Sequence, residues 1–290
     1  AKIDLSRVKK TFIINSDDEH ASYFSSFWAE EKIFYSGNFR DDLEAKVFFY
    51  DDINISLAGT SFTFIYKEKG SAEFVRRQIN LKLWGEFNVV NSLPLLSLIY
   101  NLEVDTESVI SALEKIKNIP GRMELVDVGQ KFLAIVDYAY EPTAMKKMYD
   151  LLYFLKEQIS QTGYQPNIIH ILGSAGGGRD KDRREVMGQM AGEKSEFVII
   201  TNEDPYDENP LDIINQVASG AKLAGKIEGQ NLFRILDRRE AIKKALQLAS
   251  EGDIIIITGK GCEQAICLPN SHKVPWDDRL VLKEEIIKLT

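Results

Sequence analysis

After Arg122 the chain alternates apolar segments of strand length with segments that carry helix signals, and this alternation constrains the fold more than any other feature. Such a pattern is typical of a mostly parallel, doubly wound α/β sheet. We expect strands at 132–136, 167–172, 197–201, 233–236 and 253–257, and helices at 141–158, 179–194, 210–223, 238–250 and from Asp277. The second half of the chain is therefore expected to be a Rossmann-like domain.

The first part of the chain has a different pattern. Residues 11–14, 44–50, 53–57 and 60–66 are apolar or β-prone, and residues 87–100 and 105–116 have the composition of helices. Asp105 is placed to cap the second of these helices, and Pro120-Gly121 marks a turn after it. We therefore expect two domains, residues 1–119 and 120–290.

Composition excludes several classes of protein. The chain is 44% hydrophobic and 28% charged, and its longest apolar runs, such as Ile254 to Ile257, are too short to cross a membrane. With 44 acidic and 36 basic residues, the formal charge of −8 disfavours a nucleic-acid partner. The two cysteines, Cys262 and Cys267, lack the spacing of a zinc site, which favours a reducing, cytoplasmic compartment.

Four loops are expected at the carboxyl ends of the parallel strands, where ligands bind in such folds. They comprise residues 137–140, 173–180, 201–207 and 258–263. Glycines in the second loop allow backbone amides to approach an anion. Arg179, Arg183 and Arg184 follow at the expected start of a helix, which favours a carboxylate or phosphate ligand, although a sharp turn with solvated arginines remains an alternative.

Single residues in these loops leave alternatives open. Asp137 could bind ribose or a metal-bound phosphate, or could merely cap the next helix. Lys260 could meet an anion and Glu263 an ammonium group. Residues 220–227 nearly match a phosphate loop, but Ile227 replaces the hydroxyl residue and the segment follows a helix, so we expect no phosphate loop there. The three histidines are scattered, which disfavours a histidine triad or metal cluster.

Several of these segments also form an ordered set of seven motifs: Gly85-Glu-Phe-Asn88-Val-Val-Asn91, Pro120-Gly-Arg122-Met-Glu124, Val136-Asp137-Tyr-Ala, Gly176-Gly-Gly-Arg179-Asp180, Thr201-Asn-Glu-Asp-Pro205, Asp237-Arg238 with Ala241-Ile242, and Gly259-Lys-Gly-x-Glu263. Together they resemble the Mur ligases, and specifically the branch that adds the third amino acid to UDP-N-acetylmuramoyl-dipeptide. The resemblance implies an α/β chain holding part of a central ATPase domain (1–119) and a Rossmann-like C-terminal domain that binds an amino acid (120–290).

The resemblance also implies a role for individual residues. Asn88 would contact the adenine of ATP, Arg122 its phosphates and Asp137 its ribose. Lys2 matches a lysine that is carbamylated in the family and then helps to hold Mg²⁺. The pocket for the free amino acid would be lined by Arg179, Asp204, Tyr206, Gly259 and Glu263. ATP would phosphorylate the carboxylate of the UDP-N-acetylmuramoyl-peptide, and the amino group would attack the resulting acyl phosphate.

Three departures from the family pattern bear on this expectation. Cys262 and Tyr140 stand where histidines are usual, and Tyr206 stands where enzymes that select diaminopimelate have an arginine. Because tyrosine cannot bind a second carboxylate as arginine does, we expect L-lysine or another basic amino acid as substrate. Four acids, Glu203, Asp204, Asp207 and Glu208, favour the same choice, although they could simply form a solvated loop and helix cap.

The start of the sequence and its lack of a phosphate loop predict an incomplete enzyme. By the resemblance, a uridine-nucleotide-binding domain and the ATP-binding loop would precede Lys2, so we expect negligible turnover from these 290 residues alone. Two alternatives stay open. One is another ligase on the same scaffold, such as a folylpolyglutamate or cyanophycin synthetase, and the other is a binding module without catalysis.

Overall fold

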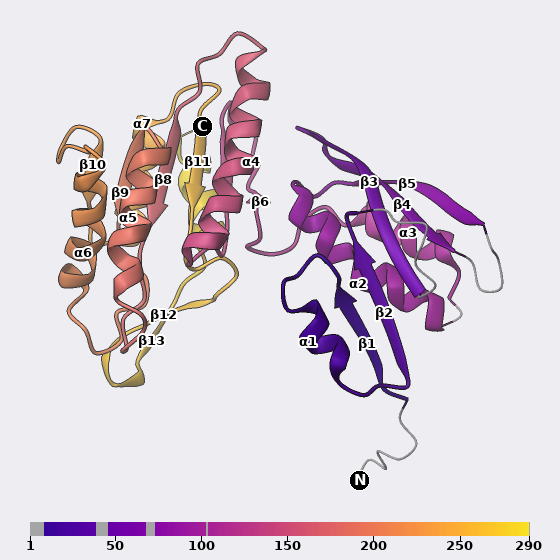
Figure 1. Cartoon of the computed structure of the whole chain (residues 1–290). Helices are drawn as coiled ribbons and strands as arrows, with labels where there is room; N and C mark the ends of the chain where they lie inside the picture. The colour runs from indigo at the N-terminus through magenta and orange to yellow at the C-terminus, as the bar shows by residue number, and fades with distance from the viewer. Residues whose placement is uncertain (1–8, 39–45, 68–72, 103, 290) are drawn as a thin grey trace. The chain divides into compact units, whose positions relative to one another are not determined.

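The chain divides into two compact units, Ala1–Lys117 and Asn118–Thr290, which are described separately. The structure is a computed structural model that describes residues 9–38, 46–67, 73–102 and 104–289 (Figure 1). The predicted domain boundary, between residues 119 and 120, lies two residues beyond this division. None of the described helices has the length and apolar character needed to cross a membrane.

The first unit is built on a five-stranded mixed sheet with the order β1-β2-β3-β4-β5. The pairs β1/β2 and β2/β3 are parallel, whereas β3/β4 and β4/β5 are antiparallel. Its elements are β1 (Thr11–Asn15), α1 (Ala21–Ser26), β2 (Glu31–Ser36), β3 (Lys46–Ser56), β4 (Gly59–Lys67), β5 (Phe74–Leu81), α2 (Glu86–Leu102) and α3 (Thr106–Lys115). The two β-prone segments expected at 44–50 and 53–57 form one strand, β3, with a register shift between Asp51 and Asn54.

Helices α2 and α3 cover one face of this sheet. Val89 and Leu93 of α2 and Ile110 of α3 are buried against strand residues that include Phe48 and Phe64. The predicted cap is present, since Asp105 accepts a hydrogen bond from the backbone N–H of Ser108 at 2.9 Å. The apolar face of each helix thus supplies the core of the first unit.

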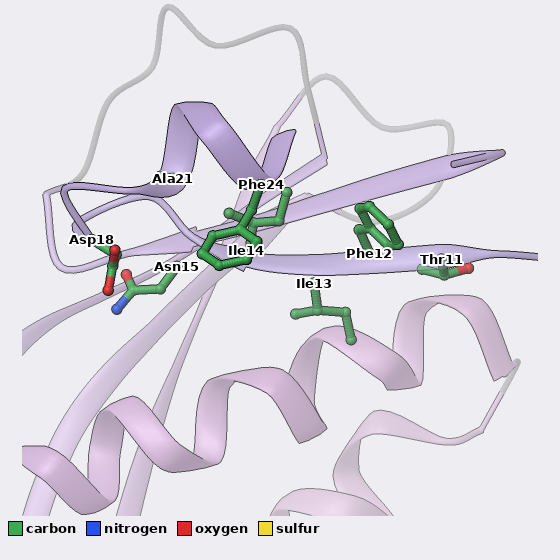
Figure 2. Close-up of a pocket in the computed structure, with 8 residues that line it drawn as sticks. All are labelled: Thr11, Phe12, Ile13, Ile14, Asn15, Asp18, Ala21 and Phe24. Carbon is green, nitrogen blue, oxygen red and sulfur yellow. The ribbon is translucent and has the colours of Figure 1, made fainter. Parts of the chain in front are cut away.

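The outer strand of this sheet borders a hollow. Among the described residues, β1 pairs only with β2. Between β1 and α1 lies a pocket of about 390 Å³, where the side chains of Phe12, Ile14 and Phe24 gather, while Ile13 points to the opposite side of the sheet (Figure 2). Helix α1 buries none of its residues, and the exposed aromatic side chains on and just after it are Tyr23, Phe24, Phe27 and Trp28.

The second unit is built on a six-stranded sheet with the order β10-β9-β8-β11-β7-β6, and it confirms the expected doubly wound α/β fold. All pairs are parallel except β6/β7. The strands are β6 (Glu124–Leu125), β7 (Leu133–Val136), β8 (Ile168–Leu172), β9 (Phe197–Ile200), β10 (Leu232–Arg234) and β11 (Ile254–Ile257). The helices are α4 (Pro142–Ser160), α5 (Asp182–Lys194), α6 (Pro210–Leu223), α7 (Arg238–Leu248) and α8 (Asp278–Ile287).

Helices cover both faces of this sheet. On one face, α7 and α8 pack against alternate strand residues such as Ile169, Ile255 and Ile257. Figure 1 shows α4, α5 and α6 side by side along the sheet. All four isoleucines of β11 are therefore fully buried, as expected of a central parallel strand.

Two features of the second unit differ from the expected pattern. Helix α5 begins at Asp182 instead of Arg179, because Gly177 and Gly178 adopt left-handed backbone angles (φ +68° and +75°) that delay the start of the helix. After β11, a short antiparallel pair joins β12 (Ala265–Cys267) to β13 (Lys273–Pro275), with a 3₁₀ turn, η2 (Pro269–Ser271), between them.

Candidate functional site

The four loops predicted at the carboxyl ends of the strands lie in contact in the second unit. The backbone N–H of Gly176 donates to the carbonyl of Asp204 at 2.7 Å, which joins the second loop to the third. A Cβ added to Gly259, where φ is +100°, would collide with the carboxylate of Glu203, so the third loop also touches the fourth. We call residues 137–140, 173–180, 201–207 and 258–263 together the carboxyl-edge site.

Lys260 joins two acids of this site. Its ammonium group donates to both carboxylate oxygens of Asp204, at 2.8 and 2.9 Å, and to Oε2 of Glu263 at 2.6 Å. The Lys260 side chain is only 1% exposed. Burial lowers its pKa, but the hydrogen bonds to Asp204 and Glu263 outweigh burial and raise the pKa above the ordinary lysine value. Lys260 is therefore a buried cation.

Glu203 is the acid of this site whose charge is least compensated. The residue is 6% exposed, and its carboxylate accepts no hydrogen bond within the described part of the chain. Burial raises the pKa of Glu203 to about 7, although the nearby charges of Arg238, Lys260 and Arg183 oppose this rise. A buried carboxylate whose pKa is raised to about 7, in loops at the carboxyl ends of the strands, is a candidate for binding a cation.

Arg238 lies beneath the same loops. Its guanidinium forms two hydrogen bonds of 2.7 Å with Asp278, and both side chains are fully buried. It also donates to the carbonyl of Asn202 at 3.1 Å and to that of Thr258 at 2.9 Å. Asn202 is the second residue of the third loop and Thr258 the first residue of the fourth, so Arg238 fixes both loops where they leave their strands. The motif containing Arg238 was evident in the sequence, but its structural role was not.

The first loop brings Asp137, Tyr138 and Arg122 together. The Asp137 carboxylate accepts backbone hydrogen bonds from Met123 at 2.9 Å and from Ala139 at 3.1 Å. Burial raises its pKa despite these hydrogen bonds. The exposed guanidinium of Arg122 lies 4.9 Å from the ring centre of Tyr138, whose hydroxyl donates to Glu263 at 2.9 Å. Tyr138 thus connects the first loop to the fourth, a contact that sequence reasoning missed.

The three arginines near the glycine loop do not form one anion site. Arg184 is fully buried and donates to both oxygens of Glu208, at 3.0 and 3.2 Å, and to the Ala175 carbonyl at 3.0 Å. It is a structural residue, so the prediction that it would help to bind an anion is wrong. Arg179 is exposed, and Arg183 lies 5.5 Å from the ring centre of Tyr140.

The acids expected to favour a basic amino acid have different surroundings. Glu208 is paired with Arg184, which lowers its pKa to about 2. Asp207 accepts a hydrogen bond from the N–H of Asn270 at 3.1 Å. Asp204 accepts hydrogen bonds from Lys260 and, at 2.7 Å, from the N–H of Cys267. Of the four, Glu203 alone accepts no hydrogen bond from the described residues.

Tyr206 lies at the end of the third loop, beside the glycine loop. Its backbone N–H donates to the Cys267 carbonyl at 3.1 Å, and its φ is +49°. A Cβ added to Gly177 would lie 2.9 Å from the Tyr206 ring, so the ring packs over that glycine. Burial and the Cys267 sulfur raise the pKa of the Tyr206 hydroxyl. Tyr206 therefore presents a neutral group at the site.

Two predicted site residues belong to the first unit. Asn88 is buried at the start of α2, where its side-chain amide donates to the Trp84 carbonyl at 2.8 Å. Lys2 lies outside the described residues. Within the described residues, no group of three or more His, Cys, Asp or Glu side chains could hold a metal ion, so no Mg²⁺ ligand is assigned among them.

Comparison with protein families gives one match to the second unit. Residues 121–261 match the model of the Mur ligase, glutamate ligase domain. The UDP-N-acetylmuramyl-tripeptide synthetase of Borreliella burgdorferi is 33% identical over 278 residues, which cover 96% of this chain and 50% of that protein. The UDP-N-acetylmuramoyl-L-alanyl-D-glutamate–2,6-diaminopimelate ligase of Alkaliphilus oremlandii is 34% identical over 275 residues, covering 94% of this chain and 51% of that protein.

Solved structures give a similar result. A UDP-N-acetylmuramoyl-L-alanyl-D-glutamate–2,6-diaminopimelate ligase matches with 27% identity and a TM-score of 0.58, covering 97% of this chain and 53% of that chain. A folylpolyglutamate synthase from Thermotoga maritima, at 16% identity and a TM-score of 0.52, covers 78% of this chain and 51% of that chain and shares the fold alone. The chain spans about half the length of the curated relatives it matches.

Proposed function

Because this chain belongs to the Mur ligase family, we propose that it is the amino-acid-binding part of a ligase that adds the third amino acid to UDP-N-acetylmuramoyl-dipeptide. Relatives named as tripeptide synthetases and as diaminopimelate ligases match almost equally well, at 33% and 34% identity. Overall identity therefore does not decide which amino acid is added, whereas the charges of the carboxyl-edge site favour one class of amino acid.

The buried carboxylate of Glu203, which accepts no hydrogen bond from the described residues, is the observation that supports a basic amino acid. A buried, ionised carboxylate without a hydrogen-bond donor is unstable, and a substrate ammonium group would supply both the donor and the charge. The neutral Tyr206 offers no charge for a second substrate carboxylate. We propose L-lysine, or another amino acid with one carboxylate and a basic side chain, as the substrate.

In the proposed reaction, the described residues bind and orient the amino-acid substrate. The attacking amino group must be neutral and held close to the carbonyl carbon of the acyl phosphate, so fixing the far end of the amino acid on Glu203 would orient it for attack. We propose that Arg179, Asp204, Tyr206, Gly259 and Glu263 form the wall of that pocket. Arg179 is exposed at its rim, where it could meet the substrate's α-carboxylate.

The proposal for the nucleotide rests on the first loop and on the first unit. The Asp137 carboxylate retains acceptor capacity for ribose hydroxyls, and the exposed Arg122 guanidinium suits a phosphate. We propose Asn88 for adenine and carbamylated Lys2 for Mg²⁺. When bound, ATP supplies the phosphoryl group that activates the substrate carboxylate. A cytoplasmic location belongs to the same proposal, because the nucleotide-linked peptide and ATP are used there.

Direct binding of amino acids to this chain tests the choice of substrate. We expect calorimetry to show binding of L-lysine that is at least tenfold stronger than binding of meso-diaminopimelate. L-norleucine is the matched control, since it has the same carbon chain without the ammonium group, and it should bind at least tenfold more weakly than L-lysine. Lysine binding should strengthen as pH rises through 7, because Glu203 then becomes ionised.

Two results would contradict the proposal. Preferential binding of meso-diaminopimelate would show that the second carboxylate is recognised after all. Equal binding of L-norleucine and L-lysine would show that no acid of the site recognises the side-chain ammonium. The chain alone should form no ligase product with ATP, because its sequence has no phosphate-loop motif, and measurable ATP-dependent product formation would overturn that part.

A further inference from the structure

The buried ammonium group of Lys260 has no task in the reaction proposed above. The residue lies between Gly259 and Gly261 at the end of β11, and its side chain is 1% exposed. It is held by Asp204, whose side chain is 9% exposed, and by Glu263, whose side chain is 39% exposed. Glu263 is held on its other oxygen by Tyr138. Both carboxylates thus already accept hydrogen bonds from side chains of the chain itself.

The two acids come from loops that the sheet does not place next to each other. Asp204 follows β9 and Glu263 follows β11, and β8 lies between these strands. Arg238 ties the two loops together at their base through the carbonyls of Asn202 and Thr258. Lys260 ties them a second time, through the side chains of Asp204 and Glu263. Arg238 therefore holds the two loops through backbone carbonyls, and Lys260 holds the same two loops through side-chain carboxylates.

The charges of the site explain why Lys260 is needed in addition to Arg238. Glu203, Asp204 and Glu263 place three carboxylates in one site, while the Arg238 charge is balanced by Asp278. Without Lys260, the Asp204 carboxylate would keep only one hydrogen-bond donor among the described residues, the backbone N–H of Cys267. Buried like charges in this arrangement repel each other, so the loops would move apart or the acids would take up protons.

Displacement of Lys260 by a substrate ammonium is disfavoured by the backbone. Gly259 and Gly261 both adopt positive φ, at +100° and +52°. An added Cβ at Gly261 would lie 2.7 Å from the Tyr138 side chain, so this segment is closely packed. Moving the ammonium group away would also leave Asp204 buried and uncompensated. A substrate ammonium therefore finds Glu203 more readily than the Asp204 and Glu263 pair.

We propose, resting on the proposed function, that Lys260 is a positioning residue that neutralises and fixes Asp204 and Glu263, so that Glu203 is left to bind the amino acid. Lys260 itself does not touch the substrate. The ammonium group of Lys260 thus holds two acids of the pocket wall in place, and Glu203 alone recognises the basic side chain of the substrate.

Chemical rescue of Lys260→Ala tests this role. The substitution removes the propylammonium part of the side chain, so n-propylammonium ions should re-enter the space and restore the contacts. We expect Lys260→Ala to weaken L-lysine binding at least tenfold and to speed hydrogen exchange of the backbone amides in residues 202–207 and 259–263. Adding n-propylammonium should reverse both effects, and tetramethylammonium, a cation of similar charge without N–H donors, should reverse neither.

A matched control and a second variant separate this role from general damage. Lys243→Ala removes a lysine that also pairs with an acid three residues away, Glu240, but on the surface, so it should change neither lysine binding nor exchange in the site. If Lys260→Ala is too unstable to purify, Lys260→Met keeps the side-chain volume without the charge. Adding Asp204→Asn to Lys260→Met should then restore protection of the loops, because the uncompensated carboxylate is gone.

The outcomes distinguish this inference from the proposed function. If the unaltered chain binds no amino acid, the proposed function fails, yet the exchange measurements still test the role of Lys260. If Lys260→Ala leaves exchange and lysine binding unchanged, the positioning role is wrong. If Lys260→Ala binds L-lysine more tightly, the substrate takes the place of Lys260, and the inference is overturned in favour of a displaced internal lysine.

Discussion

Burial gives the Glu203 carboxyl a protonation behaviour that can be measured as a change in stability. Its pKa is raised from 4.5 to about 7 in the folded chain, so the folded state binds a proton more readily than the unfolded state between these values. The contribution of this group to the free energy of unfolding is fully present below pH 4.5. It is lost as pH rises from 4.5 through 7, by up to about 1.4 kcal/mol for each pH unit.

We therefore predict that Glu203→Gln stabilises the chain at pH 8 by about 1–3 kcal/mol, since the uncharged amide avoids burial of a charge. The difference should vanish at pH 4, where Glu203 is protonated in both states. Urea unfolding at the two pH values measures it. The variant should also lose L-lysine binding. A Glu203→Gln chain that is equally or less stable at pH 8 would show that the carboxylate is compensated in the folded state.

Local sequence could identify the acids of the site, but it could not show which of them already have a partner within the chain and which can bind a substrate. Lys260 and Glu263 are candidates because they follow an apolar strand, and Asp204 is a candidate through the family resemblance. Their mutual contact depends on the order of strands in the sheet, which local sequence does not encode. The same reason hid the role of Arg238, which acts through carbonyls of residues far away in the chain, Asn202 and Thr258.

At the level of elements, α5 and α6 pack unusually closely because glycines face each other. A Cβ added to Gly220 of α6 would collide with the Glu185 carbonyl of α5, and one added to Gly188 of α5 would collide with the Val217 carbonyl. Gly220 is the first glycine of the segment that resembles a phosphate loop. Its place inside a helix, against another helix, explains the glycine without any ligand.

We predict that Gly220→Ala destabilises the second unit by about 2–4 kcal/mol, despite a gain in helix propensity of about 1 kcal/mol. The helices would have to separate to admit the methyl group. Thermal unfolding followed by circular dichroism measures the loss. Lys222→Ala, two residues along the same helix and exposed, is the control and should change stability by less than about 0.5 kcal/mol. Equal effects of the two substitutions would refute the close-packing argument.

Periodicity predicted the long elements and missed the short or polar ones. Helix α6 was expected at its observed bounds, because its apolar spacing and its Asn209-Pro210 start agree. Strand β5 has three consecutive exposed polar residues in its middle, Arg76, Arg77 and Gln78, and these interrupt the alternation of apolar and polar residues that predicts a strand. Strands β12 and β13 are three residues each, too short for any period to show. They exist because they pair with each other.

At the level of the whole molecule, each unit has its own apolar core, and the connection between them is exposed. Residues 115–120 are all exposed, and α3 ends at Lys115. Separate cores imply that each unit can keep its fold when the connection is cut.

We predict that brief trypsin treatment cleaves after Lys115 or Lys117 and releases a resistant fragment that begins near Asn118, identifiable by mass spectrometry. The double variant Lys115→Gln, Lys117→Gln removes these cleavage sites and should leave the chain intact for longer. First cleavage within α4 to α8 would show that the second unit does not resist unfolding by itself. The fragment should retain L-lysine binding, because every residue proposed for that binding lies beyond Asn118.

Among the described residues, the side of β1 away from β2 is unpaired, and this has a consequence for what the first unit can bind. A strand whose outer backbone groups face no described partner, next to four exposed aromatic side chains, is a template onto which another extended chain can add. An extended segment that paired there would continue the sheet beyond β1 and cover the aromatic side chains beside it.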